Sequence, residues 1–77
     1  MKCLLIEDPE ADKSAASLDV GVGSSLDPKP LYGTAHFLEH MLFMGTDKYP
    51  LENEYTYFIE NNGGEDNAYT TMTNTNY

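Results

Sequence analysis

The sequence is organised around His36-Phe37-Leu38-Glu39-His40, which lies in a segment of good helix formers. Residues 33–45 are rich in the good helix formers Leu, Met, Ala and Glu, and no proline interrupts them. Thr34 is a candidate N-cap, and Gly45 stands where a glycine commonly ends a helix. The sequence therefore predicts a helix over residues 33–45.

Two histidines and a glutamate lie on this helix at positions from which their side chains can converge. His36 and His40 are one helical turn apart on the same face, and Glu39 is three residues beyond the first histidine. Neutral imidazole is a preferred ligand of zinc, and catalytic zinc sites leave one position open for water. A nearby carboxylate can take a proton from that water. The order H-x-x-E-H is typical of inverzincin metalloproteases, so the spacing predicts two zinc ligands and a general base.

The alternative is that both histidines are ordinary core or surface residues, as a single histidine usually is. They are the chain's 2 histidines, and the other residues from Ala35 to Met44 are all apolar. That pattern predicts a helix buried on nearly every side. Burying a carboxylate and two imidazoles without partners is costly, whereas one cation satisfies all three groups. The metal site is therefore the favoured hypothesis.

Two strands are predicted before this helix. Residues 2–7 contain the short apolar run 3–6 and predict one strand. Residues 16–23 alternate apolar with small or polar side chains and predict the other. The proline, acidic residues and serine of residues 8–14 are typical of a turn, so we expect the two strands to pair as an antiparallel hairpin. The prolines within residues 24–30 predict a loop that leads into the helix.

A second helix and an extended segment are predicted after it. Apolar side chains recur at i, i+3 and i+4 within residues 51–62, and Gly63-Gly64 ends that segment. Beyond Asp66, β-branched and aromatic residues predict extended structure. The order strand, strand, helix, helix, strand predicts the α+β class, with residues 1–77 as the opening half of one two-layer domain and no second domain.

The composition is acidic and nearly free of cysteine. Its 13 acidic and 4 basic residues give a formal net charge of -9, which repels phosphate backbones and predicts no nucleic-acid partner. Cys3 is the single cysteine, so no intramolecular disulfide is expected and a reducing compartment is favoured. The apolar run around it is too short for a signal peptide or a membrane span. We therefore expect an intracellular, cytoplasmic protein without a membrane partner.

A longer stretch carries a family resemblance. Residues 33–46 read Gly-Thr-Ala-His-Phe-Leu-Glu-His-Met-Leu-Phe-Met-Gly-Thr, and they are followed by Lys48-Tyr49-Pro50 and Glu52-Asn53-Glu54-Tyr55. These motifs closely resemble the insulin-degrading-enzyme branch of the pitrilysin-like peptidases. The similarity extends towards both ends of the chain, including residues 67–70 and 74–77. We expect the chain to be an N-terminal catalytic-domain fragment of such a peptidase.

The resemblance implies a zinc endopeptidase that encloses short, partly unfolded polypeptides in a chamber between two halves. His36 and His40 would bind one Zn²⁺ ion, and Glu39 would act as the base. Asn67, Ala68 and Tyr69 match an edge strand that pairs with substrate backbone. Phe43 and Tyr69 match positions that line the pocket beside the scissile bond. The residues alone leave open an ordinary edge strand and ordinary core aromatics.

Two differences from the resembled family concern charge and metal ligation. Glu65-Asp66 stands where relatives carry small residues, which adds negative charge near the substrate strand and favours basic side chains. The family's third ligand is a glutamate on a helix downstream of the motif, so we expect the remainder of the peptidase chain to supply it. Glu60, Glu65 and Asp66 are chemically able to replace it but are not favoured.

Three functional hypotheses remain from sequence. The first is a zinc-dependent metalloendopeptidase of which these residues are a part, with peptides as substrates. The second is a catalytically inactive fragment that retains a peptide- or partner-binding surface. The third is an acidic domain whose histidines do no chemistry. Zinc binding and its loss on substitution of His36 or His40 separate the third hypothesis from the others.

Overall fold

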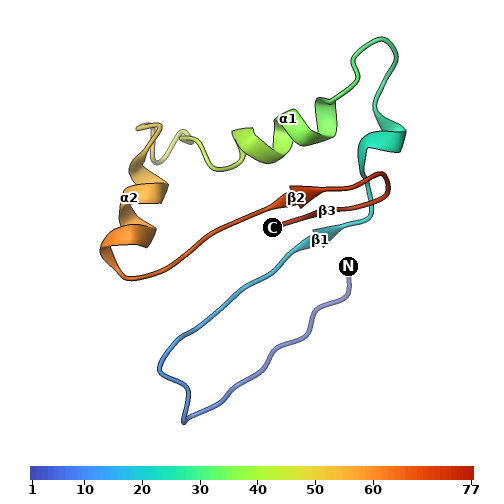
Figure 1. The fold of residues 1–77 in the computed structure, drawn as a ribbon. Helices are drawn as coiled ribbons and strands as arrows, with labels where there is room; N and C mark the ends of the chain where they lie inside the picture. The colour runs from blue at the N-terminus through green and yellow to red at the C-terminus, as the bar shows by residue number, and fades with distance from the viewer.

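The computed structural model describes residues 1–77 and combines two helices with a small sheet. In chain order the elements are β1 (Asp19–Val20), the 3₁₀ helix η1 (Ser24–Leu26), α1 (Thr34–Met41), α2 (Glu54–Asn61), β2 (Tyr69–Thr70) and β3 (Thr75–Asn76). Figure 1 shows α1 lying across one face of the strands, with α2 set off towards one end. The predicted α+β class is confirmed.

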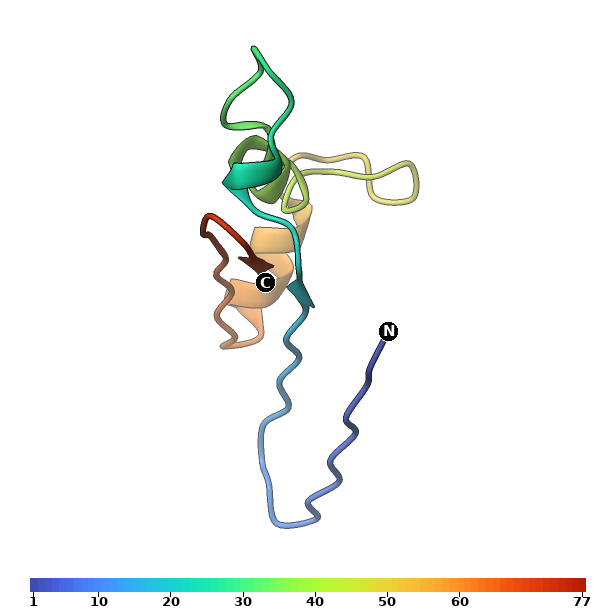
Figure 2. The same cartoon turned by 90° about the vertical axis from the view of Figure 1, so that its right-hand side faces the viewer.

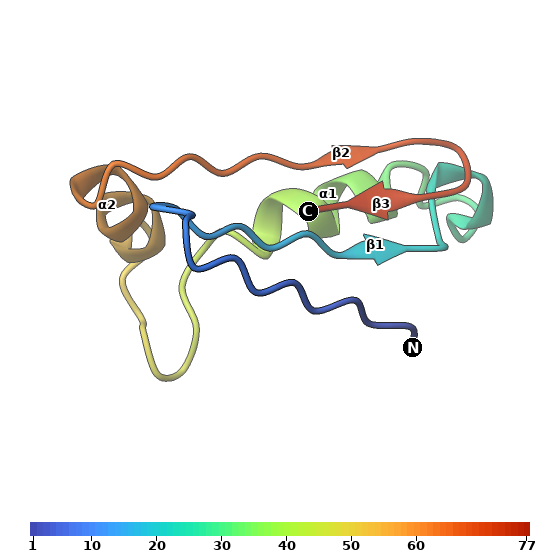
Figure 3. The same ribbon diagram turned by 90° about the horizontal axis from the view of Figure 1, so that it is seen from below.

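The strands form one antiparallel sheet in the order β1-β3-β2, seen as a single layer in Figure 3. The paired residues are Asp19 with Asn76, Val20 with Thr75, Tyr69 with Asn76, and Thr70 with Thr75. Reciprocal 2.9 Å backbone hydrogen bonds between Leu18 and Tyr77 extend the ladder between β1 and β3. The carboxylate of Asp19 also accepts hydrogen bonds from the side-chain amides of Asn74 at 2.7 Å and Asn76 at 3.2 Å. The central strand therefore holds β1 firmly, and β2 lies at an edge of the sheet.

The predicted strand over residues 2–7 and the predicted hairpin are wrong. Residues 2–7 form no strand, and no backbone hydrogen bond joins them to residues 16–23. The loop between them is held by two local hydrogen bonds that Asp8 accepts, which do not bring its two flanks into a ladder. β1 pairs instead with β3 from the opposite end of the chain, because β3 offers it both backbone and side-chain partners. Figures 1 and 2 show the N-terminal segment apart from β1.

The helix α1 begins one residue later and ends earlier than predicted, at Thr34 and Met41. Thr34 is not the N-cap: its hydroxyl donates to the carbonyl of Leu31 at 2.5 Å, and Gly33 precedes the helix with a φ of 91°. The carboxylate of Asp27 takes the capping role, since it accepts hydrogen bonds from the backbone amides of Gly33 at 2.7 Å and Ala35 at 2.9 Å. A residue seven positions before the first turn therefore fixes where α1 starts.

The second helix lies within the predicted segment and ends where the sequence indicates. α2 is followed by Asn62, whose side-chain amide donates to the carbonyl of Phe58 at 2.7 Å. Gly63 adopts a positive φ of 71°, and the amide of Gly64 then donates to the carbonyl of Ile59 at 2.9 Å. This glycine-dependent ending returns the chain towards the sheet.

The hairpin between β2 and β3 is docked against the start of η1 through a close backbone approach. The amides of Ser24 and Ser25 donate to the carbonyls of Thr71 and Met72, both at 2.9 Å. Gly23 is buried at this point, and a Cβ on it would lie 2.3 Å from the Thr71 carbonyl oxygen. Glycine is therefore required for the chain before α1 to meet the hairpin after α2.

Few residues are buried, and two of them, Glu39 and Thr75, come from α1 and the sheet. The 3 buried residues are Gly23, Glu39 and Thr75, and no hydrophobic side chain is buried. The expectation of a helix buried on nearly every side is wrong for these residues, since Phe37 is 65% and Leu38 is 53% exposed. The sheet covers one face of α1 and leaves the others open. The radius of gyration is 15.1 Å, whereas a compact domain of this length has about 11–12 Å.

Both helices are short, with 8 residues each. Neither helix has the length and apolar character needed to cross a lipid bilayer. The two layers, α1 on one side and the three strands on the other, form the open arrangement expected for part of a two-layer domain.

Candidate metal centre

The side chains of His36, Glu39 and His40 converge on one side of α1. One ligand atom from each lies within 4.8 Å of the others. The Nε2 atoms of the two histidines are 3.1 Å apart, and their rings meet edge to face with centroids 4.6 Å apart. This proximity follows from helical geometry, because residues four apart stack on the same face. The three residues predicted from the motif are therefore brought together.

The spacing of the two imidazoles fits the ligand set of one zinc ion. Two nitrogens bound tetrahedrally at about 2.0–2.1 Å lie roughly 3.3 Å from each other. The Nε2 atoms of His36 and His40 are 3.1 Å apart, so both can bind one ion with little adjustment. Nδ1 of His36 lies 3.4 Å from Oε2 of Glu39. A proton on that Nδ1 leaves the lone pair on Nε2 free for the metal.

Glu39 is the one titratable side chain buried in the structure, with 6% of its surface exposed. The hydroxyl of Thr70 on β2 donates a hydrogen bond to its Oε2 atom. Oε1 takes part in no hydrogen bond or ion pair within the chain. A buried carboxylate requires such a partner because desolvation of its charge is costly. Glu39 is thus fixed between the imidazole of His36 and the edge strand.

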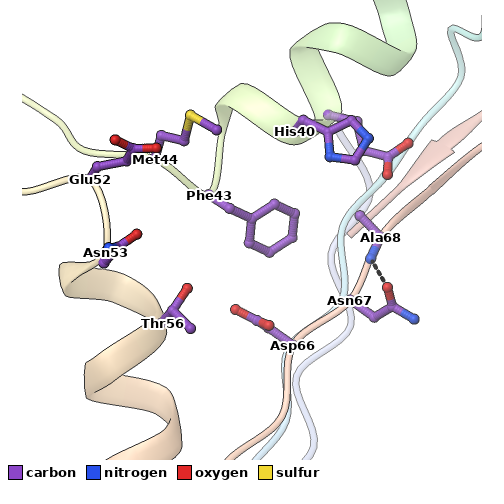
Figure 4. A pocket seen from close by; sticks show the side chains of 10 residues that line it. His40, Phe43, Met44, Glu52, Asn53, Thr56, Asp66, Asn67 and Ala68 are labelled. Atoms are coloured by element: carbon purple, nitrogen blue, oxygen red, sulfur yellow. Dashed lines mark hydrogen bonds between the residues drawn. The ribbon is translucent and has the colours of Figure 1, made fainter.

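No further carboxylate joins this cluster. The metal-ligating group consists of His36, Glu39 and His40, and it includes none of Glu60, Glu65 and Asp66. Glu60 is exposed on α2, and Asp66 lies across a cavity from His40 (Figure 4). The residues that could have replaced the third ligand are therefore placed elsewhere.

A cavity of about 330 Å³ opens beside Glu39 and His40. It is lined by residues of α1, the segment that follows α1, the turn before α2, α2 itself and the segment before β2: Glu39, His40, Phe43, Met44, Glu52, Asn53, Thr56, Asp66, Asn67 and Ala68. Figure 4 shows the Phe43 ring and the Asp66 carboxylate facing its centre. The cavity has room for one side chain next to Glu39 and His40.

Three of the four predicted substrate-binding residues line this cavity, and the fourth does not. Phe43, Asn67 and Ala68 line the cavity, whereas Tyr69 does not and is 56% exposed on β2. The side chain of Asn67 accepts a 2.9 Å hydrogen bond from the amide of Ala68. Tyr69 belongs to an edge strand, and the two residues before it have no strand partner. The outer edge of this segment is free to take another strand.

Sequence reasoning missed Thr70 and Asp27. Thr70 contacts Glu39 across 31 positions of sequence, and Asp27 caps α1 from beyond the usual capping position. No local pattern marks either role, because threonine is common in strands and aspartate is common before proline. Only the folded chain brings these residues to α1.

Known proteins share this sequence along its whole length. Residues 2–77 match the family model Insulinase (Peptidase family M16). The chain is 60% identical to the A-factor-processing enzyme of Saccharomyces cerevisiae, 54% to the insulin-degrading enzyme of Homo sapiens and 53% to mug138, a candidate zinc protease of Schizosaccharomyces pombe. Each match covers 100% of this chain, which spans 8% of the relative's length. The resemblance inferred from the motif is confirmed, and the chain belongs to the insulinase family of peptidases, family M16.

Proposed function

We propose that residues 1–77 act as part of the catalytic domain of a zinc-dependent metalloendopeptidase that cleaves short polypeptides. The observation that carries this proposal is the 3.1 Å approach of the His36 and His40 Nε2 atoms beside the buried Glu39 carboxylate. Membership of the insulinase family supports a peptidase. Because the chain spans 8% of its relatives' length, the remainder of a longer chain is proposed to complete the site and supply the third ligand.

The three residues of the cluster divide two roles between them in this proposal. His36 and His40 would hold the zinc ion, and a bound zinc ion supplies the Lewis acidity that polarises a peptide carbonyl and makes water more acidic. Glu39 acts as the general base: Thr70 holds Oε2, so Oε1 is the atom that accepts the proton of the attacking water. The same carboxyl group then gives a proton to the leaving amine.

Peptide substrate is proposed to bind along the edge of the sheet and into the adjoining cavity. An extended peptide can add to the free edge at residues 67–69, with its backbone as the donor and acceptor. One of its side chains would then enter the cavity beside Phe43. The name of the insulin-degrading relative describes a polypeptide substrate, which supports the same class for this protein.

The proposal is tested with the longer peptidase chain and a fluorogenic peptide. Glu39→Gln should retain zinc but lower kcat by about 100-fold or more, because the amide cannot accept the water's proton. Glu60→Gln is the matched control, since Glu60 is exposed on α2 and outside the cluster, and it should retain wild-type turnover. Full activity of Glu39→Gln would refute the assigned base.

The alternative is that the 77 residues, on their own, are a non-catalytic binding module. The broad exposure of apolar side chains favours it, since Phe37, Leu38 and Leu42 are each more than half exposed and offer a surface for a partner. This alternative predicts peptide binding without turnover. Hydrolysis by the 77-residue chain that Glu39→Gln abolishes would exclude it.

A further inference from the structure

We propose that Thr70 is a positioning residue for peptide hydrolysis, which holds the general base and links it to the substrate-binding edge of the sheet; this rests on the function proposed for Glu39. The Thr70 hydroxyl donates a hydrogen bond to Oε2 of Glu39 across 31 positions of sequence. The only other polar group close to that oxygen is Nδ1 of His36, at 3.4 Å. Thr70 is therefore the hydroxyl donor that fixes this carboxylate.

The hydrogen bond orients the catalytic oxygen. A glutamate side chain has several rotatable bonds, and a general base is effective only when its acceptor atom is held in reach of the proton. With Oε2 bound to Thr70, rotation of the Glu39 carboxylate is restricted and Oε1 has a defined direction. The burial of Glu39 prevents water from replacing this donor freely.

Thr70 can serve this purpose because its own strand is held in place. It lies opposite Thr75 in the sheet. Thr75 is 5% exposed, and its hydroxyl donates to the carbonyl of Val22 at 2.8 Å. The central strand is bound in turn to β1, so the Thr70 hydroxyl projects from a rigid element rather than from a free loop.

The position of Thr70 also connects it with the substrate. It follows directly after residues 67–69, the proposed peptide-binding edge, and Asn67 and Ala68 line the cavity next to Glu39. A peptide that adds to this edge pairs with the same segment that carries Thr70, the residue that holds the base. The contribution of Thr70 should therefore appear in turnover more than in substrate affinity.

The test compares hydroxyl-free and hydroxyl-retaining variants of the longer peptidase chain. Thr70→Val keeps the shape of the side chain and should lower kcat about 10- to 100-fold, with KM within about threefold, because a small misplacement of a catalytic group is costly. Thr70→Ser should restore kcat to within about threefold of wild type. Thr70→Ala is a second hydroxyl-free variant with the same expectation as Thr70→Val.

Thr73→Val is the matched control on the same hairpin. The Thr73 hydroxyl donates to the side chain of Asn74 at 2.7 Å and does not contact Glu39, so its removal should leave kcat at the wild-type value. Crystal structures of the metal-free variants give a readout that is independent of activity. The Glu39 carboxylate should leave its position in Thr70→Val and keep it in Thr70→Ser.

Two outcomes would overturn the role of Thr70 while leaving the proposed function intact. One is wild-type kcat for both hydroxyl-free variants in a protein that Glu39→Gln inactivates. The other is an equal loss in Thr70→Val and Thr70→Ser with Glu39 unmoved, which indicates a structural role.

In a Glu39→Gln background, Thr70→Val should cause no further loss of kcat, because Thr70 acts through Glu39. An active Glu39→Gln variant would overturn the proposed function itself.

Discussion

The Nε2 atoms of His36 and His40 lie 3.1 Å apart on successive turns of α1. The helix brings them together, since both side chains project from the same face. Their separation is close to the spacing of two ligands on a tetrahedral ion. The pair therefore needs little rearrangement to bind metal, and we propose that the remainder of a longer chain supplies the third ligand.

The 77-residue chain by itself should bind zinc weakly. It offers two imidazoles within reach of one ion, and every acidic residue except Glu39 lies outside the cluster. Loss of one protein ligand is expected to lower zinc affinity by about 100-fold or more relative to the longer chain. Competition with a fluorescent chelator measures both affinities at one pH. Equal affinities would mean that the 77 residues already contain a complete site.

Removal of the Asp27 carboxylate should loosen the start of α1. Asp27→Ala deletes the acceptor for the amides of Gly33 and Ala35, and loss of a helix cap costs about 0.5–2 kcal/mol. Hydrogen exchange of these two amides should accelerate roughly 2- to 30-fold. Asp12→Ala is the control, because Asp12 is exposed and makes no hydrogen bond. Unchanged exchange in Asp27→Ala would contradict the capping role.

An alanine at position 23 should disturb the docking of the hairpin. Its Cβ would lie 2.3 Å from the Thr71 carbonyl oxygen, and forced overpacking of this kind costs about 1–3 kcal/mol. Amide exchange at Ser24 and Ser25 should report the loss of their hydrogen bonds to the hairpin. Gly21→Ala meets nothing within 4 Å and should leave both amides protected. Equal protection in the two variants would show that the close approach is unimportant.

Asp66 should influence which peptides are cleaved. Its carboxylate faces the cavity beside Phe43, makes no ion pair within the chain and shares the cavity with Glu52 (Figure 4). Asp66→Asn should lower kcat/KM for peptides with a lysine or arginine near the scissile bond about 2- to 5-fold relative to neutral peptides. Asp47→Asn is the control outside the cavity. An equal effect on both peptide classes would exclude an electrostatic role.

The elements that sequence predicted well are those decided by near neighbours. The spacing of His36, Glu39 and His40 is a property of one helical turn, and the end of α2 depends on Gly63 next to it. Helix propensity and glycine conformation act over a few residues, so a single sequence reveals them. The cluster and the second helix could therefore be anticipated.

The features that could not be predicted from the sequence depend on residues far apart in the chain. Residues 16–23 alternate as a strand should, but alternation does not say which strand pairs with them. The observed pairing of Asp19 with Asn76 joins positions far apart in the chain. The contact of Thr70 with Glu39 is of the same kind. Such contacts join distant elements of the folded chain, and no local sequence pattern predicts them.

The most direct test of the central claim is the zinc content of the longer peptidase chain after dialysis against metal-free buffer. The wild-type protein should retain one zinc ion per chain, and His36→Ala and His40→Ala should each lose it, because each removes one of the two nitrogens that lie 3.1 Å apart. Glu39→Gln should retain the ion, since the base is not a ligand. Full zinc retention in both histidine variants would contradict the account.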